Sequence, residues 1–176
     1  MNIVKSFDGK MIDVGSCMGC TKANNFGNTK INPGEIVRTK NFDISQDFEL
    51  PINGFIIIGS IRHIESINEM TFDEKQELIT FIDIVICELK KLGVCSQYDV
   101  VWEEKEGNHF HVWLMPRHKY LLEAIGTNII KKVGDLFEYA KTNLRTQENM
   151  SAIYDTIEKL KTNLKQNKNI KHLIVE

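Results

Sequence analysis

The sequence predicts an α+β fold, in which an antiparallel meander of about five strands carries a packed helix and is followed by C-terminal helices. Three observations support this prediction. Short segments of strand-like pattern, separated by turn residues, recur in the first two thirds of the chain. A single long helical pattern interrupts them at residues 71–92, and the periodicity is helical again from residue 120 onward.

Three strand signals lie in the first sixty residues. Residues 1–13 predict a hairpin, because apolar pairs flank a turn-forming Asp-Gly dipeptide. Residues 15–34 are rich in Gly, Asn and Thr and predict a loop. Residues 35–39 alternate as a strand. The nearly continuous apolar run at residues 54–60 is typical of a central strand that is buried on both faces.

The strongest local signal is the helix at residues 71–92. Thr71 and Glu74 form a capping-box pattern, in which each side chain satisfies a backbone amide near the other residue. Gly93 stands where a residue of left-handed conformation commonly ends a helix. The apolar residues between them follow the spacing of three and four that forms one helix face, which we expect to pack on the sheet. They are Leu78, Phe81, Ile82, Val85, Ile86, Leu89 and Leu92.

A second hairpin is predicted after this helix. Residues 98–102 form its first strand, and residues 105–107 form the turn. In the second strand, three larger polar or aromatic side chains alternate with apolar ones, so the two sets point to opposite faces. The first set is His109, His111 and Trp113, and the apolar set is Phe110, Val112 and Leu114. Two neighbouring imidazoles can supply a nucleophile and a group that tunes it, although a structural role for both is the alternative.

Two amphipathic helical patterns make up most of the remaining chain. They span residues 121–140 and 150–164, with a polar stretch between them. A chain of 176 residues is long enough for one core domain with an appendage and too short for two ordinary domains. We therefore expect a core domain at residues 1–118 and a helical C-terminal extension at residues 119–176.

Charge and composition limit the classes of partner. The chain has 22 Lys and Arg against 24 Asp and Glu, a net charge of −2, so no general basic field favours a nucleic-acid polymer. No apolar run approaches the length of a membrane span, and the N-terminus lacks the apolar stretch of a signal peptide. We therefore expect a cytoplasmic protein with no membrane partner. Its four cysteines do not suggest a disulfide framework, and Cys87 and Cys95 are expected to be buried, inert thiols.

The segment His-Phe-His-Val-Trp-Leu-Met-Pro-Arg, from His109 to Arg117, resembles the signature of the histidine triad (HIT) superfamily of nucleotide hydrolases and transferases. That signature is H-x-H-x-H followed by two apolar residues, commonly with Pro-Arg next. The chain keeps the first two histidines, His109 and His111. Trp113 stands where the family has its third histidine.

Other segments resemble the same family in the expected order. Residues 54–63, followed by a helix, are similar to the segment that precedes the catalytic strand of the family. The pair Cys17 and Cys20 matches the zinc-containing branch. Together the similarity covers roughly residues 12–118, and it implies a HIT-like fold.

The resemblance implies a nucleotide hydrolase or nucleotidyl transferase that acts at the α-phosphate, for instance of a dinucleoside polyphosphate. It assigns to His111 the role of a nucleophile that forms a covalent nucleotidyl-histidine, with His109 beside it in the catalytic set. Neutral imidazole is a good nucleophile near neutral pH. Trp113 offers an N–H donor but cannot shuttle a proton, which argues against simple hydrolysis. The alternatives are a nucleotide-binding module with reduced catalysis and a zinc-stabilised interaction module.

The resemblance also implies a zinc site. Cys17, Cys20, His63 and His109 make up two sulfur and two nitrogen ligands, the set that holds structural zinc in a closed tetrahedron. In the alternative interpretation the two cysteines are ordinary loop thiols, and His109 only orients His111.

Contacts to the ribose are expected from Asp47, which stands seven residues before Gly54. Family members place an acceptor for the ribose hydroxyls at that spacing, and a carboxylate suits two hydroxyl donors. Asp43 is the alternative ribose contact. Residues 43–53 are expected to form a loop that is prone to insertions, and an insertion would change which aspartate has the corresponding position.

Contacts to the phosphates are expected from Asn108, Trp113 and Arg117. Backbone amides around Gly107 and Asn108 are candidates to stabilise the phosphoryl oxygens. Arg117 could meet distal phosphates, although a charge at the end of a strand is usually only solvated. Family members commonly dimerise, so the resemblance implies a homodimer.

Overall fold

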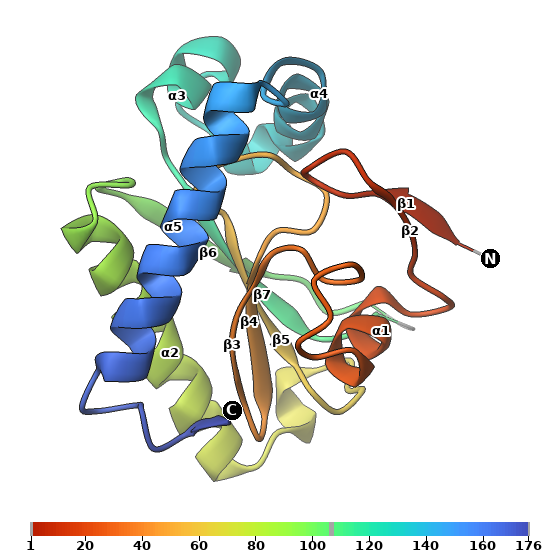
Figure 1. The fold of residues 1–176 in the computed structure, drawn as a ribbon, viewed down its shortest axis with the longest axis vertical. Coiled ribbons are helices and arrows are strands. Elements are labelled where there is room, and N and C mark those ends of the chain that lie inside the picture. The colour runs from red at the N-terminus through yellow and green to blue at the C-terminus, as the bar shows by residue number, and fades with distance from the viewer. Residues whose placement is uncertain (1, 106–107, 176) are drawn as a thin grey trace.

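The computed structural model describes residues 2–105 and 108–175, and it has an α+β fold with antiparallel sheets and five α-helices, which confirms the predicted fold class (Figure 1). The main sheet has six strands in the order β6-β7-β5-β4-β3-β8, and a separate pair is formed by β1 and β2. The strands are β1 (Ile3–Lys5), β2 (Met11–Asp13), β3 (Glu35–Thr39), β4 (Phe42–Gln46), β5 (Ile56–Ser60), β6 (Tyr98–Trp102), β7 (His111–Pro116) and β8 (Ile174–Val175). The helices are α1 (Met18–Asn24), α2 (Phe72–Lys91), α3 (Lys119–Ile125), α4 (Val133–Asn143) and α5 (Gln147–Gln166), with 3₁₀ turns at Ile67–Glu69 and Ile129–Lys132.

The sheet is a meander only over its first three strands. Strands β3, β4 and β5 follow one another as antiparallel neighbours. The chain then passes through α2 to the edge strand β6 and returns as β7, which pairs with both β6 and β5. The hairpin of residues 98–102 with the histidine strand is confirmed, although β7 begins at His111 and not at His109. The turn predicted at residues 105–107 lies partly outside the described residues.

Strand β4 occupies part of the segment that was predicted to be a loop. The loop expectation for residues 43–53 is wrong for its first four positions, because Phe42–Gln46 is a strand whose five residues are all buried. Three of them, Asp43, Ser45 and Gln46, are polar, and the first two bind the Lys22 side chain. A buried strand with partnered polar side chains lacks the apolar pattern that identifies strands from sequence.

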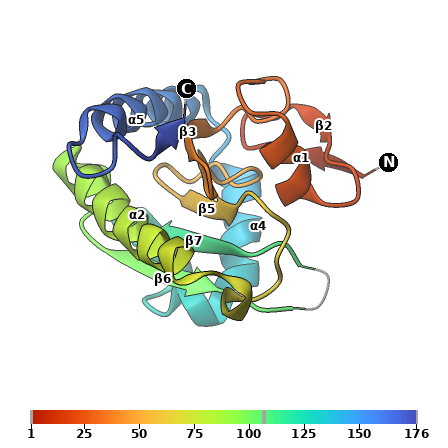
Figure 2. The same cartoon turned by 90° about the horizontal axis from the view of Figure 1, so that it is seen from below.

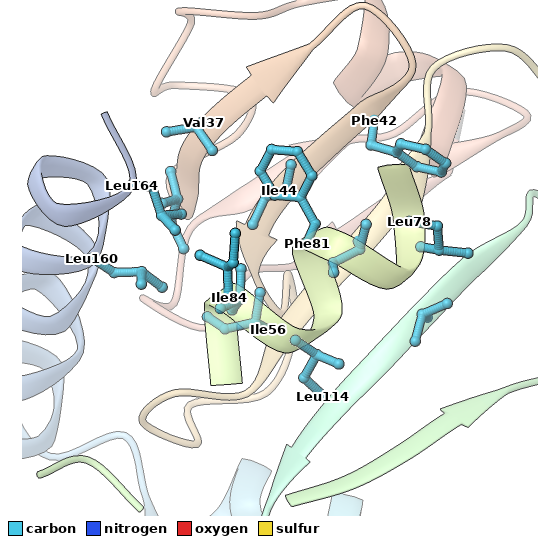
Figure 3. Close-up of a cluster of buried hydrophobic side chains, with 14 of the residues drawn as sticks. Val37, Phe42, Ile44, Ile56, Leu78, Phe81, Ile84, Leu114, Leu160 and Leu164 are labelled. Carbon is cyan, nitrogen blue, oxygen red and sulfur yellow. The ribbon is translucent and has the colours of Figure 1, made fainter. Parts of the chain in front are cut away.

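Helices cover both faces of the sheet (Figure 2). Helices α2 and α5 lie on one face, where their apolar side chains pack with those of β4, β5 and β7 in the larger core (Figure 3). Helices α3 and α4 pack on the other face, against Leu50, Phe55, Ile57 and Met115. Ile56 and Ile58 face the first core and Ile57 the second, so β5 is buried on both faces as predicted.

The predicted helix in the middle of the chain is confirmed. Thr71 is the N-cap of α2, and both hydrogen bonds of its capping box with Glu74 are present. Gly93 follows the helix with a positive φ of 72°. Cys95 is buried as expected, but Cys87 is exposed on α2 and that expectation is wrong. The apolar stripe of α2 packs in the core. The side of the helix that carries Cys87 lies outside this stripe and is exposed.

The N-terminal segment differs in part from its prediction. The β1–β2 hairpin is confirmed, but its loop has five residues, 6–10, because Lys5 pairs with Met11. Residues 15–34 are not a continuous loop, since α1 forms within them. The Cys17 side chain caps this helix by accepting from the backbone N–H of Cys20 at 3.4 Å.

The segment after residue 118 is integrated with the rest of the fold. Ile153, Ile157, Leu160 and Leu164 of α5 belong to the larger core, and β8 pairs with β3. The division of the chain at residue 118 stays a prediction. No helix among the described residues is long and apolar enough to span a bilayer.

Candidate metal cluster and substrate cavity

Four predicted metal ligands meet at the start of α1. The Sγ atoms of Cys17 and Cys20 come from the first turn of the helix, His63 follows β5, and His109 precedes β7. Their four ligand atoms all lie within 4.8 Å of one another. This cluster of Cys17, Cys20, His63 and His109 is hereafter called the Cys2His2 cluster, and it could bind a metal ion.

The spacing of the Cys2His2 cluster fits a tetrahedral metal. The two Sγ atoms lie 3.3–3.5 Å from the Nδ1 atoms of the two histidines. A sulfur about 2.3 Å and a nitrogen about 2.1 Å from a tetrahedral zinc ion are roughly 3.6 Å apart. The four sulfur–nitrogen distances therefore match the corresponding edges of a coordination tetrahedron.

Ser60 and Gly19 fix the His109 ring. Its Nε2–H donates to the Ser60 carbonyl at 2.6 Å, which leaves the Nδ1 lone pair directed at the cysteines. Gly19 lies against the other side of the ring, because a Cβ atom at this position would be 2.4 Å from His109 Cγ. Burial lowers the pKa of His109, which favours the neutral form that binds metals. Nε2 is thus engaged by Ser60 and Nδ1 faces the two cysteines, and the catalytic role of His109 stays a prediction.

A cavity of about 390 Å³ lies beside the Cys2His2 cluster. Its volume is within the range of roughly 300–1,000 Å³ that is typical of small-molecule sites. Six of the predicted functional residues line it: Cys17, Asp47, Asn108, His109, His111 and Trp113. Asp43, the rival of Asp47, also lines it.

In this cavity, one ring nitrogen of His111 has no hydrogen-bond partner among the described residues. Its Nδ1–H donates to the His109 carbonyl at 2.8 Å, and a carbonyl can only accept, so Nε2 carries the lone pair. Burial lowers the pKa of His111, and the nearby Lys22 charge lowers it further, against the opposing effect of that hydrogen bond. The ring is therefore neutral near pH 7, as a nucleophile requires.

The floor of the cavity is the face of the sheet between β4 and β7. Asp43 pairs with Gly59, and Gly59 pairs with His111, so these three residues form one row across three strands. Because Gly59 has no side chain, the space above it is open. The next row carries Ser45, Ile57 and Trp113.

Lys22 reaches this floor from α1. It is only 8% exposed. Its Nζ donates to Ser45 Oγ at 2.5 Å and lies 3.3 Å from Asp43 Oδ2. A lysine is seldom buried unless it is paired, and here the pair lies in the wall of a cavity. Sequence reasoning missed Lys22, because a single lysine in a short helix carries no pattern.

Asp47 has an unusual carboxyl group. Its Oδ1 accepts from the backbone amides of Glu49 and Leu50 at 2.9 and 2.7 Å. Burial is the largest influence and raises the pKa to about 6, although the two hydrogen bonds oppose it. A carboxyl group with a raised pKa in a cavity is a candidate for ligand binding.

Helix α4 supplies another wall of the cavity. Phe137 of α4 lies with its ring centroid 5.8 Å from that of Trp113. One helical turn further, Lys141 lines the cavity and forms an ion pair with Glu49 at 2.8 Å. No motif indicated these two residues, since the recognisable segment ends before them.

The remaining predicted phosphate contacts are less favourably placed. Arg117 is not among the cavity residues; it pairs with Asp99 at 2.7 Å and donates to the Thr127 carbonyl. The backbone amide of Asn108 donates to the Lys105 carbonyl at 3.0 Å, so it is not free for a phosphoryl oxygen. Gly107, the other candidate amide, lies outside the described residues.

Comparisons with solved structures agree with the fold. No protein-family model and no curated protein matches the chain. Among solved structures, a Zn-bound histidine triad family protein from Mycobacterium smegmatis is 13% identical, with a TM-score of 0.53 over 84% of this chain and 99% of that one. A HIT family protein from Bacillus anthracis is 16% identical, with a TM-score of 0.50 over 81% of this chain and 94% of that one. The C. elegans NitFhit protein has a TM-score of only 0.46 at 13% identity, and this chain spans 26% of its length. The chain therefore has the fold of the histidine triad proteins.

Proposed function

We propose that this protein is a nucleotide hydrolase or nucleotidyl transferase that acts at the α-phosphate with His111 as its nucleophile. The observation that carries the proposal is the unprotonated Nε2 of His111 in a cavity whose floor is open at Gly59. A phosphoryl group above Gly59 would lie directly beside this nitrogen. The histidine triad fold supports the same assignment, because the corresponding motif contains His109 and His111.

The reaction has two displacements at phosphorus. The Nε2 lone pair of His111 forms a bond to the α-phosphorus, and the leaving group departs with the electrons of the broken P–O bond. Water or another acceptor then forms an O–P bond at the same phosphorus and loses its proton to solvent, while the N–P bond breaks and its electron pair returns to Nε2 of His111. Trp113 cannot protonate the leaving group, so substrates with good leaving groups, such as dinucleoside polyphosphates, suit this site best.

Asp43 and Asp47 are the proposed ribose contacts. Both carboxyl groups line the cavity. Asp47 Oδ1 is already used by two amides, and Asp43 already bears the Lys22 ammonium. Each has a second carboxyl oxygen that can accept a hydrogen bond from a ribose hydroxyl. We place the ribose between them, with Trp113 and Asn108 toward the phosphates.

Zinc is the proposed occupant of the Cys2His2 cluster. The donor set and its spacing fit a closed structural site, which stabilises a fold and leaves no open position for a substrate. Cys17 and Cys20 would tie α1 to His63 and His109. His109 would thereby hold the strand that carries His111, which gives it a positioning role.

The test uses His111→Asn with His172→Asn as control. His172 is an exposed histidine near the C-terminus. We expect His111→Asn to bind nucleotides and to lose turnover by at least about 10³-fold, because it removes the nucleophile and little volume. Mass spectrometry of the quenched wild type should show a nucleoside monophosphate on His111. Wild-type turnover by His111→Asn would refute the covalent mechanism.

A nucleotide-binding module with little turnover is the second candidate. Trp113 favours it, since the indole packs against Phe55 and Phe137 in a position where the histidine triad motif has a third imidazole. Nucleotide binding without turnover by the wild type would support this candidate. A homodimer and a cytoplasmic location stay predictions; light scattering at micromolar concentration tests the first.

A further inference from the structure

We propose that Lys22 is a phosphate-binding residue of the cavity, whose ammonium group provides a positive charge that Trp113 cannot. The proposal deepens the proposed function, because it concerns the phosphate of the same nucleotide. It rests on the burial and partners of Lys22, on the row of residues across the sheet, and on the helix from which Lys22 projects.

The Lys22 ammonium is buried yet incompletely satisfied. An ammonium group has three N–H donors. Ser45 Oγ accepts one at 2.5 Å, and Asp43 Oδ2 lies 3.3 Å away. Within residues 2–105 and 108–175, no other group bonds to the ammonium, so one donor is available to a ligand in the cavity that Lys22 lines.

The row across the sheet places this ammonium opposite the nucleophile. Asp43, which holds Lys22, and His111 are separated by the single residue Gly59. Neighbouring strands are roughly 4.8 Å apart, so the Cα atoms of Asp43 and His111 are about 10 Å apart. A Cβ atom at Gly59 would meet only His111 Cβ, at 4.0 Å.

A phosphoryl group fits this open position. Above Gly59 it has the His111 imidazole on one side and the Lys22 ammonium on the other. Attack by His111 concentrates negative charge on the phosphoryl oxygens, and a preorganised cation stabilises that charge. Trp113, in the next row, has no cationic form. Lys22 is thus the cation that adjoins this position on the β4 side of the floor.

Helix α1 gives Lys22 a fixed position. The same seven-residue helix contributes Cys20 to the Cys2His2 cluster and Lys22 to the cavity. The ammonium is therefore placed by an element that the cluster anchors, and little side-chain freedom remains to be lost when a ligand binds. A flexible surface lysine would lack this advantage.

The competing explanation is that Lys22 only neutralises the buried Asp43. The two explanations differ in what they predict for ligands with and without a phosphate. A phosphate contact contributes to binding of a nucleotide and not of its nucleoside. A purely structural ion pair supports both ligands equally, because it acts on the shape of the cavity.

The experiment measures the affinities of the common ribonucleosides and their 5′-monophosphates by titration calorimetry. The phosphate preference is the ratio of the nucleoside Kd to the nucleotide Kd for the best-binding base. Lys22→Gln keeps an amide donor for Asp43 and Ser45 but removes the charge. We expect it to lower the preference roughly ten- to hundredfold, the range for a charge-assisted hydrogen bond. Lys22→Arg should retain most of the preference.

Lys91→Gln is the matched control. Lys91 forms an ion pair with the buried Glu88 at 2.7 Å on α2, and it is not among the residues that line the cavity. This variant makes the same change in net charge and should keep the wild-type preference. A similar loss in Lys91→Gln would mean that overall charge is responsible and would overturn the proposal.

The remaining outcomes separate the two proposals. If Lys22→Gln weakens nucleoside and nucleotide equally, Lys22 is structural and the inference is wrong, while the proposed function stands. If the wild type binds neither ligand, the proposed function itself fails. Should Lys22→Gln not fold, NMR of wild type labelled at lysine Cε, with the signal assigned through Lys22→Arg, replaces it. The nucleotide must then shift the Lys22 signal and the nucleoside must not; equal shifts would overturn the inference.

Discussion

Gly19→Ala should destabilise this protein, although the same change normally stabilises a helix. Gly19 lies in the first turn of α1, directly against the His109 ring. Its φ is not in the left-handed region, so alanine is compatible with the backbone. On helix propensity alone, the substitution would raise the free energy of unfolding by up to about 1 kcal/mol.

The contact with His109 reverses that sign. A new Cβ would lie 2.4 Å from His109 Cγ and 2.7 Å from Nδ1. Ordinary carbon contacts are about 3.5 Å, so the ring must move by about 1 Å. Overpacking of this kind costs about 1–3 kcal/mol, which exceeds the helix gain. Metal sites tolerate ligand displacements of only about 0.2 Å, so zinc affinity should fall by more than about 100-fold.

Gly134→Ala is the control for this prediction. Gly134 lies in α4, also without a positive φ, and a Cβ there would have no neighbour within 4 Å. It should stabilise by about 0.5–1 kcal/mol. Urea denaturation measures both variants, and competition with a chromophoric chelator measures zinc affinity. If Gly19→Ala gains stability as Gly134→Ala does and binds zinc as the wild type does, the close packing of Gly19 on His109 is not real.

Three further predictions concern the cluster and the cavity. The folded pKa of Asp47, about 6, is above its ordinary 3.8, so the folded state holds the proton more tightly. Its contribution to stability therefore falls as pH rises from about 4 to about 6, by at most about 3 kcal/mol. Asp47→Asn should remove that slope in urea denaturation at a series of pH values, and an unchanged slope would assign it to another group. Free zinc at a hundredfold excess over its Kd should stabilise the metal-stripped chain by about 2.7 kcal/mol. Cys20→Ser should abolish this gain. A melting temperature that zinc does not shift would argue against the site. Trp113→His should raise turnover of substrates with poor leaving groups by roughly 10²-fold or more, because it restores a side chain that can protonate the leaving group. An unchanged rate in steady-state kinetics would contradict a general-acid role for this position.

The elements predicted from sequence were those with strong local patterns. Helix α2 has a capping box and a continuous apolar stripe, so its ends were predicted within one residue. The apolar run of β5 and the alternating pattern of β7 also predicted strands that the structure contains. Strand β4 was not predicted, because Asp43 and Ser45 occupy two of its five buried positions and are paired with Lys22, which is more than twenty residues away in the sequence. Local pattern carries no information about such a distant partner.

The members of the Cys2His2 cluster were predictable and the cavity walls were not. Cys17 and Cys20 have a spacing that suits one metal ion, and the motif of β7 pointed to His109. His63 was found only because its segment resembles a known one. By contrast, Gly19 is required by the ring of a residue ninety positions later, and its role appears only when the distance to His109 is known.

The cavity combines the recognisable part of the chain with a part that no motif describes. The row of Asp43, Gly59 and His111 belongs to the former, and in the proposed function the reacting phosphate lies above it. Phe137 and Lys141 belong to the latter, and they close the cavity beside Trp113 and Glu49. A phosphate is common to all nucleotides, whereas a base or leaving group differs between them. If the proposed function is correct, residues that contact the phosphate determine the reaction type, and we expect selection among substrates at the wall provided by α4.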